Sequence, residues 1–445
     1  MRSATPKVLH EIGGRSLLGH VLAAAADSGA ADVAVVVGHG RDEVEPHVTA
    51  CLPAARTAVQ HEQLGTGHAA MVGLDAVPAD DGTVLVVMGD TPLLRGDLLR
   101  RLSEAHAAAG GVITVLTARP ADPSGYGRVL RDGTGAVTGV VEHKDATDAQ
   151  KRLDEVNTGM YAFDLAWVRA ALPRVGRDNA QGEIYLTDVV GLARSEERGV
   201  ATVLAEDALV AEGVNDRVQL AALAAELNRR TLEDWMRAGV TVVDPGSTWV
   251  DVTVRLEQDV RLLPGVQLHG ATTVATGAVV GPDCTLTGVR VGSGAQVVRT
   301  HGADAVLGDG ATVGPFAYLR PGTVLDAAGK IGTFVETKNS HIGPRAKVPH
   351  LSYIGDADVG AGANLGAGTI TANYDGRAKH RTVIGARVRS AVHVSFVAPV
   401  RVGDDAWTAA GSVITHDVPP GALGVARERQ RNVEGYAARK GGRPS

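Results

Sequence analysis

The chain has little of several features that mark secreted or membrane proteins. Its 445 residues include two cysteines, Cys51 and Cys284, which are far apart and stand in no metal-ligand spacing. A disulfide framework is therefore excluded, and a reducing compartment is expected. No apolar run reaches the roughly 18 residues of a membrane span, and the N-terminus has no signal-type segment. We expect a soluble cytoplasmic protein.

Charge of one sign is not in excess either. Lysine and arginine total 44, aspartate and glutamate total 50, and the formal net charge is -6. Such a chain has no general positive field that would attract nucleic acid or an anionic membrane. Local groups of lysine and arginine can still bind small anions, so the expected partners are small molecules.

Aromatic residues are scarce, at 3% of the chain, whereas glycine is abundant, at 56 residues. Many glycines follow an aliphatic residue, and these pairs begin at positions 280, 291, 307, 313, 331, 342, 354, 384 and 402. The intervals between them include 6, 12, 18 and 30 residues. A period of six, with the aliphatic side chain inward and glycine permitting a corner, predicts a parallel β-helix of hexapeptide repeats. The polar stretch 369–385 breaks the period and is expected to be a loop that can carry binding groups.

The first half of the chain has a different pattern. Three β-rich apolar runs, at 32–40, 83–90 and 111–119, alternate with alanine-rich amphipathic segments. This alternation predicts a mostly parallel, doubly wound α/β sheet of the Rossmann-like kind. Ligands of such sheets bind beyond the carboxyl ends of the strands.

A long helix is expected between these two parts, because residues 216–236 have apolar side chains at helical spacing. We therefore predict three segments along the chain. They are a nucleotide-binding domain at 1–217, a helical linker at 218–238 and a β-helix domain with a C-terminal tail at 239–445.

A few residues have candidate roles from their position alone. Asp90 ends the run 83–90, where a carboxylate can hold Mg²⁺, although an aspartate after a strand is more often a turn residue. Thr66 stands between two glycines, so backbone N–H groups can approach a ligand, but an ordinary loop explains the pattern as well. Lys7 and Asn215 have ordinary explanations too, as a solvated charge and a helix cap.

Several stretches of the chain together resemble one family. They are "PKVLHEIGGRSLLGHV", "QHEQLGTGHAA", "VVMGDTPLL", "DPSGYGRV", "VVEHKDAT", "VNTGMYAF", "NAQGEIYLTD", "EGVNDR", "GPFAYLRPG", "PHLSYIGDA" and "GAGTITANYDG". The family is the bifunctional N-acetylglucosamine-1-phosphate uridylyltransferase and glucosamine-1-phosphate N-acetyltransferase of bacterial cell-wall precursor synthesis. The resemblance covers nearly the whole chain. It implies a left-handed β-helix, a homotrimer, and synthesis of UDP-N-acetylglucosamine from acetyl-CoA, UTP and a sugar phosphate, with Mg²⁺ and release of pyrophosphate.

For the uridylyltransferase half, the resemblance assigns residues to phosphate, metal, base and sugar. Lys7 matches the lysine that binds the reacting phosphates, and Asp90 and Asn215 match the contacts of Mg²⁺. The implied uridine contacts are Gln60, Gly65 and Thr66, and the implied amino-sugar contacts are Gly127, Glu142 and Asn157. Nucleotidyl transfer joins two polyanions, so cations that neutralise phosphate and groups that position it supply most of the rate.

For the acetyltransferase half, His350 matches the family's catalytic histidine, and an imidazole is suited to remove a proton from the sugar ammonium. Arg320 and Lys338 match the residues that hold the sugar phosphate, where paired cations suit a dianion. The other implied contacts are Tyr353 and Asn364 for the sugar, Ala367, Asn373, Tyr374, Val392, Ala410 and Arg427 for acetyl-CoA, and Lys379 reaching in from a neighbouring subunit.

Two features depart from the family's pattern. Val392 stands where the family has a serine whose hydroxyl meets acetyl-CoA, so one hydrogen bond, typically about 1 kcal/mol, is expected to be lost. The family's first strand and glycine-rich turn, of the form L-A-A-G-x-G-T-R-M, would precede Pro6, and Met1 falls at the final methionine of that motif. The resemblance therefore predicts little uridylyltransferase activity for the chain as it stands, unless translation starts upstream.

Three other functions stay open at this point. Without the glycine-rich turn the chain could act as an acetyltransferase only. A non-catalytic trimeric scaffold, degenerate at both sites, is a second alternative. Another sugar-nucleotide pyrophosphorylase with a regulatory β-helix is disfavoured, because such a protein would lack "PHLSYIGDA" and "NYDG".

Overall fold

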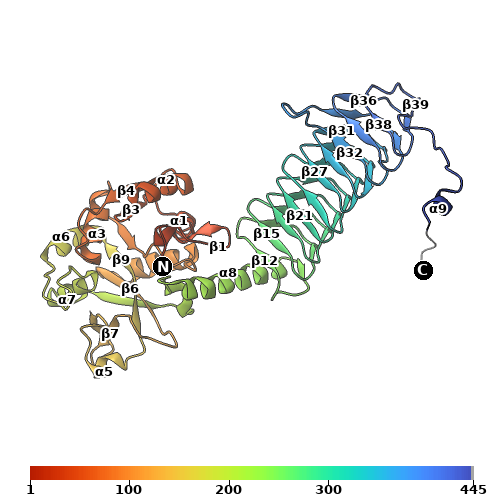
Figure 1. Cartoon of the computed structure of the whole chain (residues 1–445). Helices are drawn as coiled ribbons and strands as arrows, with labels where there is room; N and C mark the ends of the chain where they lie inside the picture. The colour runs from red at the N-terminus through yellow and green to blue at the C-terminus, as the bar shows by residue number, and fades with distance from the viewer. Residues whose placement is uncertain (442–445) are drawn as a thin grey trace. The chain divides into compact units, whose positions relative to one another are not determined.

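A computed structural model of the chain describes residues 1–441, which form two compact units. Unit 1 is Met1–Leu227, and unit 2 begins at Asn228 (Figure 1). The boundary lies inside the long helix α8 (Arg217–Arg237), at the place where the sequence predicts one. The first half of α8 packs its leucines in unit 1, and the second half packs Leu232 in unit 2. The helix is thus shared by the two units.

Unit 1 contains helices around a mixed sheet. Its helices before α8 are α1 (Leu17–Asp27), α2 (Arg41–Cys51), α3 (Thr66–Asp75), α4 (Gly96–Ala109), α5 (Asp148–Lys151), α6 (Leu165–Ala171) and α7 (Val189–Ser195), with 3-10 turns η1 (Lys7–Leu9), η2 (Leu172–Arg174), η3 (Leu186–Asp188) and η4 (Ala208–Ala211). The sheet has the order β10 (Val200–Leu204), β6 (Ile113–Ala118), β9 (Val156–Asp164), β7 (Arg128–Arg131) and β8 (Val137–Val141), and β5 (Thr83–Val86) also pairs with β9. Two further pairs are β3 (Ala34–Val37) with β4 (Arg56–Val59) and β1 (Glu11–Ile12) with β2 (Arg15–Ser16).

The strands β3, β5 and β6 lie within the three predicted apolar runs, and the sheet departs from the expected mostly parallel arrangement at β9 and at the β7–β8 hairpin. β3 with β4 and β6 with β10 pair in parallel, whereas β9 runs antiparallel to β5, β6 and β7. Between β6 and β9 the chain has only the hairpin β7–β8 and the four-residue α5. Without a long crossover helix, antiparallel pairing is the arrangement that such connections favour.

The sheet is nevertheless covered on both faces, as a doubly wound fold requires. Every residue of β6 is buried. Ile113 and Val115 of β6 pack with side chains of α3, α6 and α7, whereas Leu116 and Ala118 pack with α1 and α4. Successive residues of a strand point to opposite faces, so one strand joins both core layers. None of the helices within residues 1–441 is both long and apolar enough to cross a membrane.

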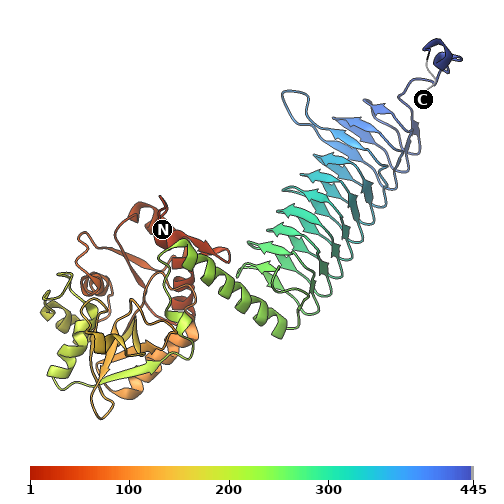
Figure 2. The same cartoon turned by 60° about the horizontal axis from the view of Figure 1, so that its bottom comes forward.

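Unit 2 is a coil of short parallel strands stacked into three sheets, the predicted β-helix (Figure 2). The first face consists of β11 (Thr241–Val242), β14 (Arg261–Leu262), β17 (Val279–Val280), β20 (Gln296–Val297), β23 (Thr312–Val313), β26 (Lys330–Thr333) and β29 (Lys347–His350), and a sheet of β34 (Arg389–Ser390), β37 (Trp407–Thr408) and β39 (Leu423–Gly424) follows it. The second face consists of β12 (Trp249–Val250), β15 (Gln267–His269), β18 (Thr285–Thr287), β21 (Thr300–Ala303), β24 (Ala317–Leu319), β27 (Glu336–Lys338), β30 (Tyr353–Gly355), β32 (Ile370–Ala372), β35 (Ser395–Val397) and β38 (Val413–Ile414). The third face consists of β13 (Arg255–Leu256), β16 (Thr273–Val274), β19 (Arg290–Val291), β22 (Val306–Leu307), β25 (Val324–Leu325), β28 (His341–Ile342), β31 (Ala357–Val359), β33 (Thr382–Ile384) and β36 (Val400–Val402). The short helix α9 (Tyr436–Arg439) lies beyond the coil.

The aliphatic-glycine pairs have the predicted place in this coil. Most two-residue strands have an exposed residue followed by a buried one, and the buried residues form one continuous apolar core. Ile331 is fully buried in that core. A Cβ at the following Gly332 would lie 1.9 Å from the carbonyl oxygen of Pro349 in the next coil. Glycine is therefore required there because successive coils approach so closely.

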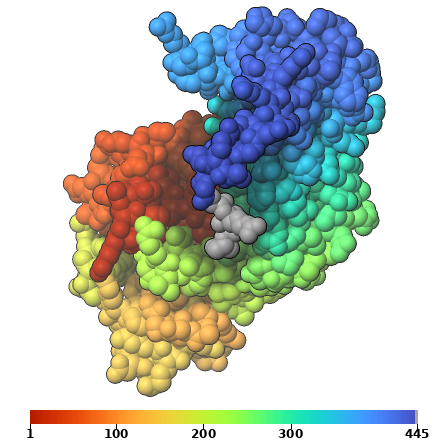
Figure 3. Space-filling model, turned by 45° about the vertical axis from the view of Figure 1, so that its right-hand side comes forward, coloured from red at the N-terminus to blue at the C-terminus, as the bar shows by residue number. Residues whose placement is uncertain are grey.

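One loop leaves the coil between β32 and β33, inside the predicted stretch 369–385. It projects from the stack in Figure 2 and as light-blue atoms in Figure 3. Tyr374 and Lys379 pair across it, and the carboxylate of Asp375 accepts hydrogen bonds from the backbone N–H groups of Arg377 at 2.8 Å and Ala378 at 2.7 Å. Hydrogen bonds within the loop thus give it a defined hairpin shape.

Candidate active sites

Unit 1 contains a cavity of about 1390 Å³ that runs along β3 and β5 and continues past their carboxyl ends. Its lining includes most of the residues that the resemblance assigns to the uridylyltransferase site, namely Lys7, Gln60, Thr66, Asp90, Gly127, Glu142, Asn157 and Asn215. Gly65 precedes Thr66 at the start of α3. Residues from distant parts of the sequence therefore converge on one cavity.

A lysine and two oxygen donors meet at one end of this cavity. Nζ of Lys7 donates to Oδ2 of Asp90 at 2.6 Å and to Oδ1 of Asn215 at 3.3 Å. The backbone N–H of Val214 donates to the carbonyl oxygen of Asp90 at 3.2 Å, which ties the segment of Asn215 to that of Asp90. A Cβ at Gly213 would lie 3.2 Å from both carboxylate oxygens of Asp90, so glycine leaves that carboxylate accessible.

The donor set at this end fits Mg²⁺ that arrives with a nucleotide. Among residues 1–441, no three His, Cys, Asp or Glu side chains gather as metal ligands. Asp90 and Asn215 instead offer one carboxylate and one amide oxygen on either side of the Lys7 ammonium. Mg²⁺ typically takes one or two protein oxygens and completes its shell with water and phosphate. These residues therefore suit a shared Mg²⁺ site better than a permanent protein cage.

The glycine-flanked loop forms a second wall of the cavity. Nε2 of Gln60 donates to the carbonyl oxygen of Gly65 at 3.3 Å, and Oγ1 of Thr66 accepts from the backbone N–H of Leu186 at 3.1 Å. Gly65 has φ 106°, and a Cβ there would lie 2.6 Å from the carbonyl oxygen of Ile184. A side chain at Gly65 is excluded both by its backbone conformation and by this contact. The loop is thus held against the segment 184–186, with its backbone close to the cavity.

A half-buried carboxylate, that of Glu142, forms the third wall. Burial raises the pKa of Glu142, and the hydroxyl of Thr187 donates to its Oε1 at 3.3 Å. Gly127 lies beside Glu142, and its carbonyl oxygen accepts from the backbone N–H of Asn157 at 2.9 Å. Carboxylate and amide groups of this kind can accept hydrogen bonds from sugar hydroxyls. Thr187 was not predicted, although it lies in the quoted stretch "NAQGEIYLTD".

In unit 2, His350 lies at the corner between the first and second faces. It is the last residue of β29 and it is exposed. Backbone hydrogen bonds link Gly368 to the carbonyl of His350, His393 to that of Ala367, and Gly411 to that of Val392. Because of these links, four exposed or half-exposed residues lie one above the other in a column. They are His350, Ala367, Val392 and Ala410. Three predicted acetyl-CoA contacts therefore lie directly along the corner from the predicted catalytic histidine.

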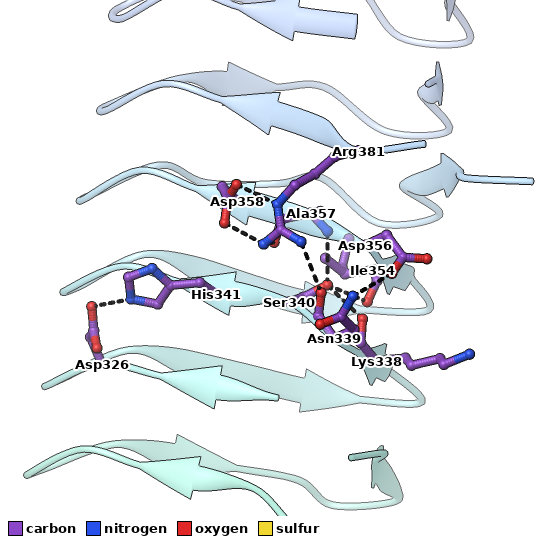
Figure 4. Close-up of polar contacts among 10 residues, drawn as sticks. All are labelled: Asp326, Lys338, Asn339, Ser340, His341, Ile354, Asp356, Ala357, Asp358 and Arg381. Atoms are coloured by element: carbon purple, nitrogen blue, oxygen red, sulfur yellow. Dashed lines mark hydrogen bonds and ion pairs between the residues drawn. The ribbon is translucent and has the colours of Figure 1, made fainter. Parts of the chain in front are cut away.

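A group of cations lies at the next corner, between the second and third faces. Nη1 of Arg320 pairs with Oε1 of Glu336 at 2.9 Å. Lys338 ends β27, and its side chain points outward in Figure 4. The side chain of Lys379 beside it lowers the pKa of Lys338. The projecting loop of the same chain brings Lys379 to Lys338, and the expected contribution of Lys379 to a neighbouring subunit stays a prediction. Glu336 was not predicted.

One short strand separates the two corners. Tyr353, Ile354 and Gly355 form β30, and three residues of a strand advance about 10 Å. A Cβ at Gly355 would lie 2.3 Å from the hydroxyl oxygen of Tyr353, so glycine allows the Tyr353 ring to lie along the strand. The side chains of Arg320, Lys338 and His350 are long enough to meet at one small ligand that lies over this strand.

The other predicted contacts of unit 2 are spread more widely. Asn364 pairs with Lys347 and Arg389, at the opposite end of the strand that ends in His350, so a single chain does not bring Asn364 beside that histidine. Asn373 is buried at the base of the projecting loop, whereas Tyr374 is exposed. Arg427 is exposed and follows Ala426, whose backbone N–H donates to the hydroxyl of Ser412.

The chain is similar along almost its whole length to several bacterial proteins. Its residues 1–156 match the family of MobA-like NTP transferase domains. It is 58% identical to the bifunctional protein GlmU of Paenarthrobacter aurescens (strain TC1), over 98% of this chain and 89% of that protein. The bifunctional proteins GlmU of Kineococcus radiotolerans and Streptomyces coelicolor are 57% and 55% identical, over 100% and 99% of this chain and 91% and 92% of those proteins.

Proposed function

The chain belongs to the family of bifunctional GlmU proteins, and we propose that each of its two units carries one of the two reactions. The protein is an enzyme of UDP-N-acetylglucosamine synthesis, which supplies cell-wall precursors. It transfers an acetyl group from acetyl-CoA to glucosamine 1-phosphate, and a uridylyl group from UTP to the acetylated product. In our proposal, residues 1–217 carry uridylyl transfer and residues 239–445 carry acetyl transfer.

In unit 1 the cavity residues bind and align two phosphate groups. Lys7 neutralises phosphate charge, while Gln60 and Thr66 hold the uracil ring and Glu142 holds the sugar. Asp90 and Asn215 hold Mg²⁺, which supplies further neutralisation of the reacting phosphates when it is bound. The phosphate oxygen of N-acetylglucosamine 1-phosphate then attacks the α-phosphorus of UTP, and pyrophosphate leaves. Alignment and charge neutralisation supply the rate, because phosphoryl transfer needs little covalent help from the protein.

In unit 2 the acceptor lies across β30. Arg320 and Lys338 bind its phosphate, and the column above His350 binds acetyl-CoA. The imidazole of His350 takes a proton from the sugar ammonium, and the freed amine attacks the thioester carbon. The nitrogen loses a second proton as the carbon–sulfur bond breaks, so one proton goes to the CoA thiolate and the other to solvent.

The arrangement of the cations and His350, one strand apart, carries this proposal. It requires the acceptor to have both an amine and a phosphate. We therefore expect glucosamine 1-phosphate to be acetylated with a kcat/KM at least about a hundredfold above that of glucosamine, because charge-assisted hydrogen bonds to the phosphate are lost. Release of CoA thiol measures the acetylation of either sugar. Equal rates with the two sugars would contradict the assignment of the cations to the phosphate, and no release with either sugar would favour a non-catalytic scaffold.

The partner we propose is two further copies of this chain. Phe316, Phe334 and Leu351 are exposed by 53%, 57% and 60%, and they occupy one corner of successive coils. Their φ angles are positive, and the rings of Phe316 and Phe334 stack at 5.5 Å. An exposed apolar row of this kind supports burial against another subunit. Light scattering tests the homotrimer, and a monomer at micromolar concentration would contradict it.

We also propose that the enzyme works in the cytoplasm, because its two co-substrates, UTP and acetyl-CoA, are made and used there. Mg²⁺ is the metal that we propose for its uridylyl transfer. Both cysteines are free thiols, which agrees with a reducing compartment. A reporter fused to the full chain, followed by cell fractionation, tests this location. Recovery of the fusion outside the cytoplasm would contradict it.

A further inference from the structure

Asp356 is a buried carboxylate at the corner that carries the cations. It lies between β30 and β31 and is 8% exposed. Its Oδ1 accepts from Nδ2 of Asn339 at 2.6 Å, and its Oδ2 accepts from Nδ2 of Asn373. Figure 4 shows the first contact, with Asn339 and Lys338 adjacent on one coil. The carboxylate thus joins the coil of Lys338 to the base of the projecting loop.

The backbone of Asp356 holds the other end of the same loop. Its carbonyl oxygen accepts from the backbone N–H of Thr382 at 3.1 Å. The loop therefore leaves the coil at Asn373 and returns at Thr382, with both ends bound to one residue. Since Lys379 lies on this loop, the position of its ammonium group depends on Asp356.

The charges around this carboxylate are nearly all positive. Burial acts to raise the pKa of Asp356, but the hydrogen bonds from Asn339 and Asn373 outweigh it, and the pKa lies below its ordinary value. The charged groups that face Asp356 or Lys338 are Lys379, Arg320 and Arg381, and Arg320 and Arg381 also pair with the carboxylates of Glu336 and Asp358. Asp356 is therefore the carboxylate that offsets the repulsion between Lys338 and Lys379.

We propose that Asp356 is a positioning residue for the acceptor, which sets the separation of Lys338 and Lys379 by binding Asn339 and Asn373. Two ammonium groups held apart at a fixed distance match the oxygens of one phosphate dianion. The hydrogen bond to Asp356 also fixes the orientation of the Asn373 amide, with its nitrogen toward Asp356. This inference rests on the proposed acetyl transfer, because it assigns the phosphate of glucosamine 1-phosphate to this pair of lysines.

Substitution Asp356→Asn tests the role of the charge. Asparagine keeps the size, and it tolerates the φ of 48° at this position. We expect the KM for glucosamine 1-phosphate to rise about tenfold, while the KM for acetyl-CoA stays within about twofold. Loss of a nearby negative charge makes the protonated form of Lys338 less favourable, so its pKa falls further. The alkaline limb of kcat/KM for the sugar phosphate should therefore move to lower pH, which a purely structural role would not produce.

Two further variants keep the test clear. Asn339→Gly removes one of the two amides without backbone strain, because residue 339 has φ 44° and glycine accepts that conformation. It should raise the same KM by about threefold. Asp326→Asn is the matched control, since Asp326 pairs with His341 at 2.7 Å on the third face, away from the two lysines (Figure 4). It should leave the KM and the pH profile unchanged.

The possible results distinguish a failure of the Asp356 role from a failure of the proposed acetyl transfer. If the unaltered chain does not acetylate glucosamine 1-phosphate, the proposed function fails first. If it does, and Asp356→Asn has the KM and alkaline limb of the unaltered chain, the positioning role is refuted. A raised KM without any shift of the limb would likewise refute the electrostatic part. Asn339→Gly decides the matter if Asp356→Asn does not fold, and an unchanged KM in that variant would overturn the inference.

Discussion

Replacing His350 by alanine should remove catalysis in unit 2 without harming its fold. The side chain is exposed, and within residues 1–441 its ring makes no hydrogen bond. Exposed side chains without such contacts usually change the free energy of unfolding by less than about 0.5 kcal/mol. A positioned general base typically contributes about 10²–10⁴-fold to the rate. We therefore expect the kcat of acetyl transfer to fall by that factor.

The KM values separate a base from a binding residue. His350 lies below the Ala367–Val392–Ala410 column and one strand away from Lys338, so neither acetyl-CoA nor the phosphate should depend on its ring for binding. Both KM values should stay within about threefold, which is the pattern for a group that acts mainly in the transition state. Initial rates of CoA thiol release, measured while each substrate is varied, give these constants.

His341→Ala is the matched control, because it removes a histidine from the same stack but from the third face. His341 pairs with Asp326, and an exposed pair contributes about 0–1 kcal/mol, so this variant should keep full activity. If His350→Ala retained the full kcat near neutral pH, another group would be the base. If instead the kcat of His350→Ala fell together with a large drop in its melting temperature, the exposed His350 side chain would be needed for the fold, contrary to our expectation.

Three further results are expected. Val392→Ser should lower the KM for acetyl-CoA by up to about tenfold, through one recovered hydrogen bond, with little change in kcat, and the same assay measures it. Asp90→Asn should raise the Mg²⁺ concentration needed for half-maximal uridylyl transfer by at least about tenfold, and a metal titration that shows no shift would count against the Asp90 site. Burial lowers the pKa of His20 from 6.5 to about 4, so its neutral ring stabilises the fold above pH 6.5 and this stability is lost as the pH falls toward 4. The loss should be about 3 kcal/mol, so the difference in the free energy of unfolding between pH 7 and pH 4, measured with urea, should be about 3 kcal/mol smaller in His20→Gln than in the unaltered chain.

The local pattern of the sequence was enough for the architecture of unit 2. A buried aliphatic residue and a glycine, as in Ile331-Gly332, are needed wherever one coil turns against the next, so the period appears directly in the chain. The long helix α8 was visible for the same reason, since its apolar spacing is local. In unit 1 the runs that became β3, β5 and β6 were visible, but the antiparallel placement of β9 was not, because strand direction depends on the path of the chain between strands.

For the sites, the sequence supplied the residue types, and their family resemblance supplied the candidate roles of Asp90, Asn215, Lys338 and His350. Tertiary structure decided which of them meet. Lys7 reaches both Asp90 and Asn215 only because the chain folds back over more than two hundred residues. Asp356 joins Asn339 and Asn373 because each lies 17 residues away, one coil on either side of it. Coil length and loop closure set that register, and neither can be read from a short motif, so the contact between a carboxylate and two amides belongs to the fold alone.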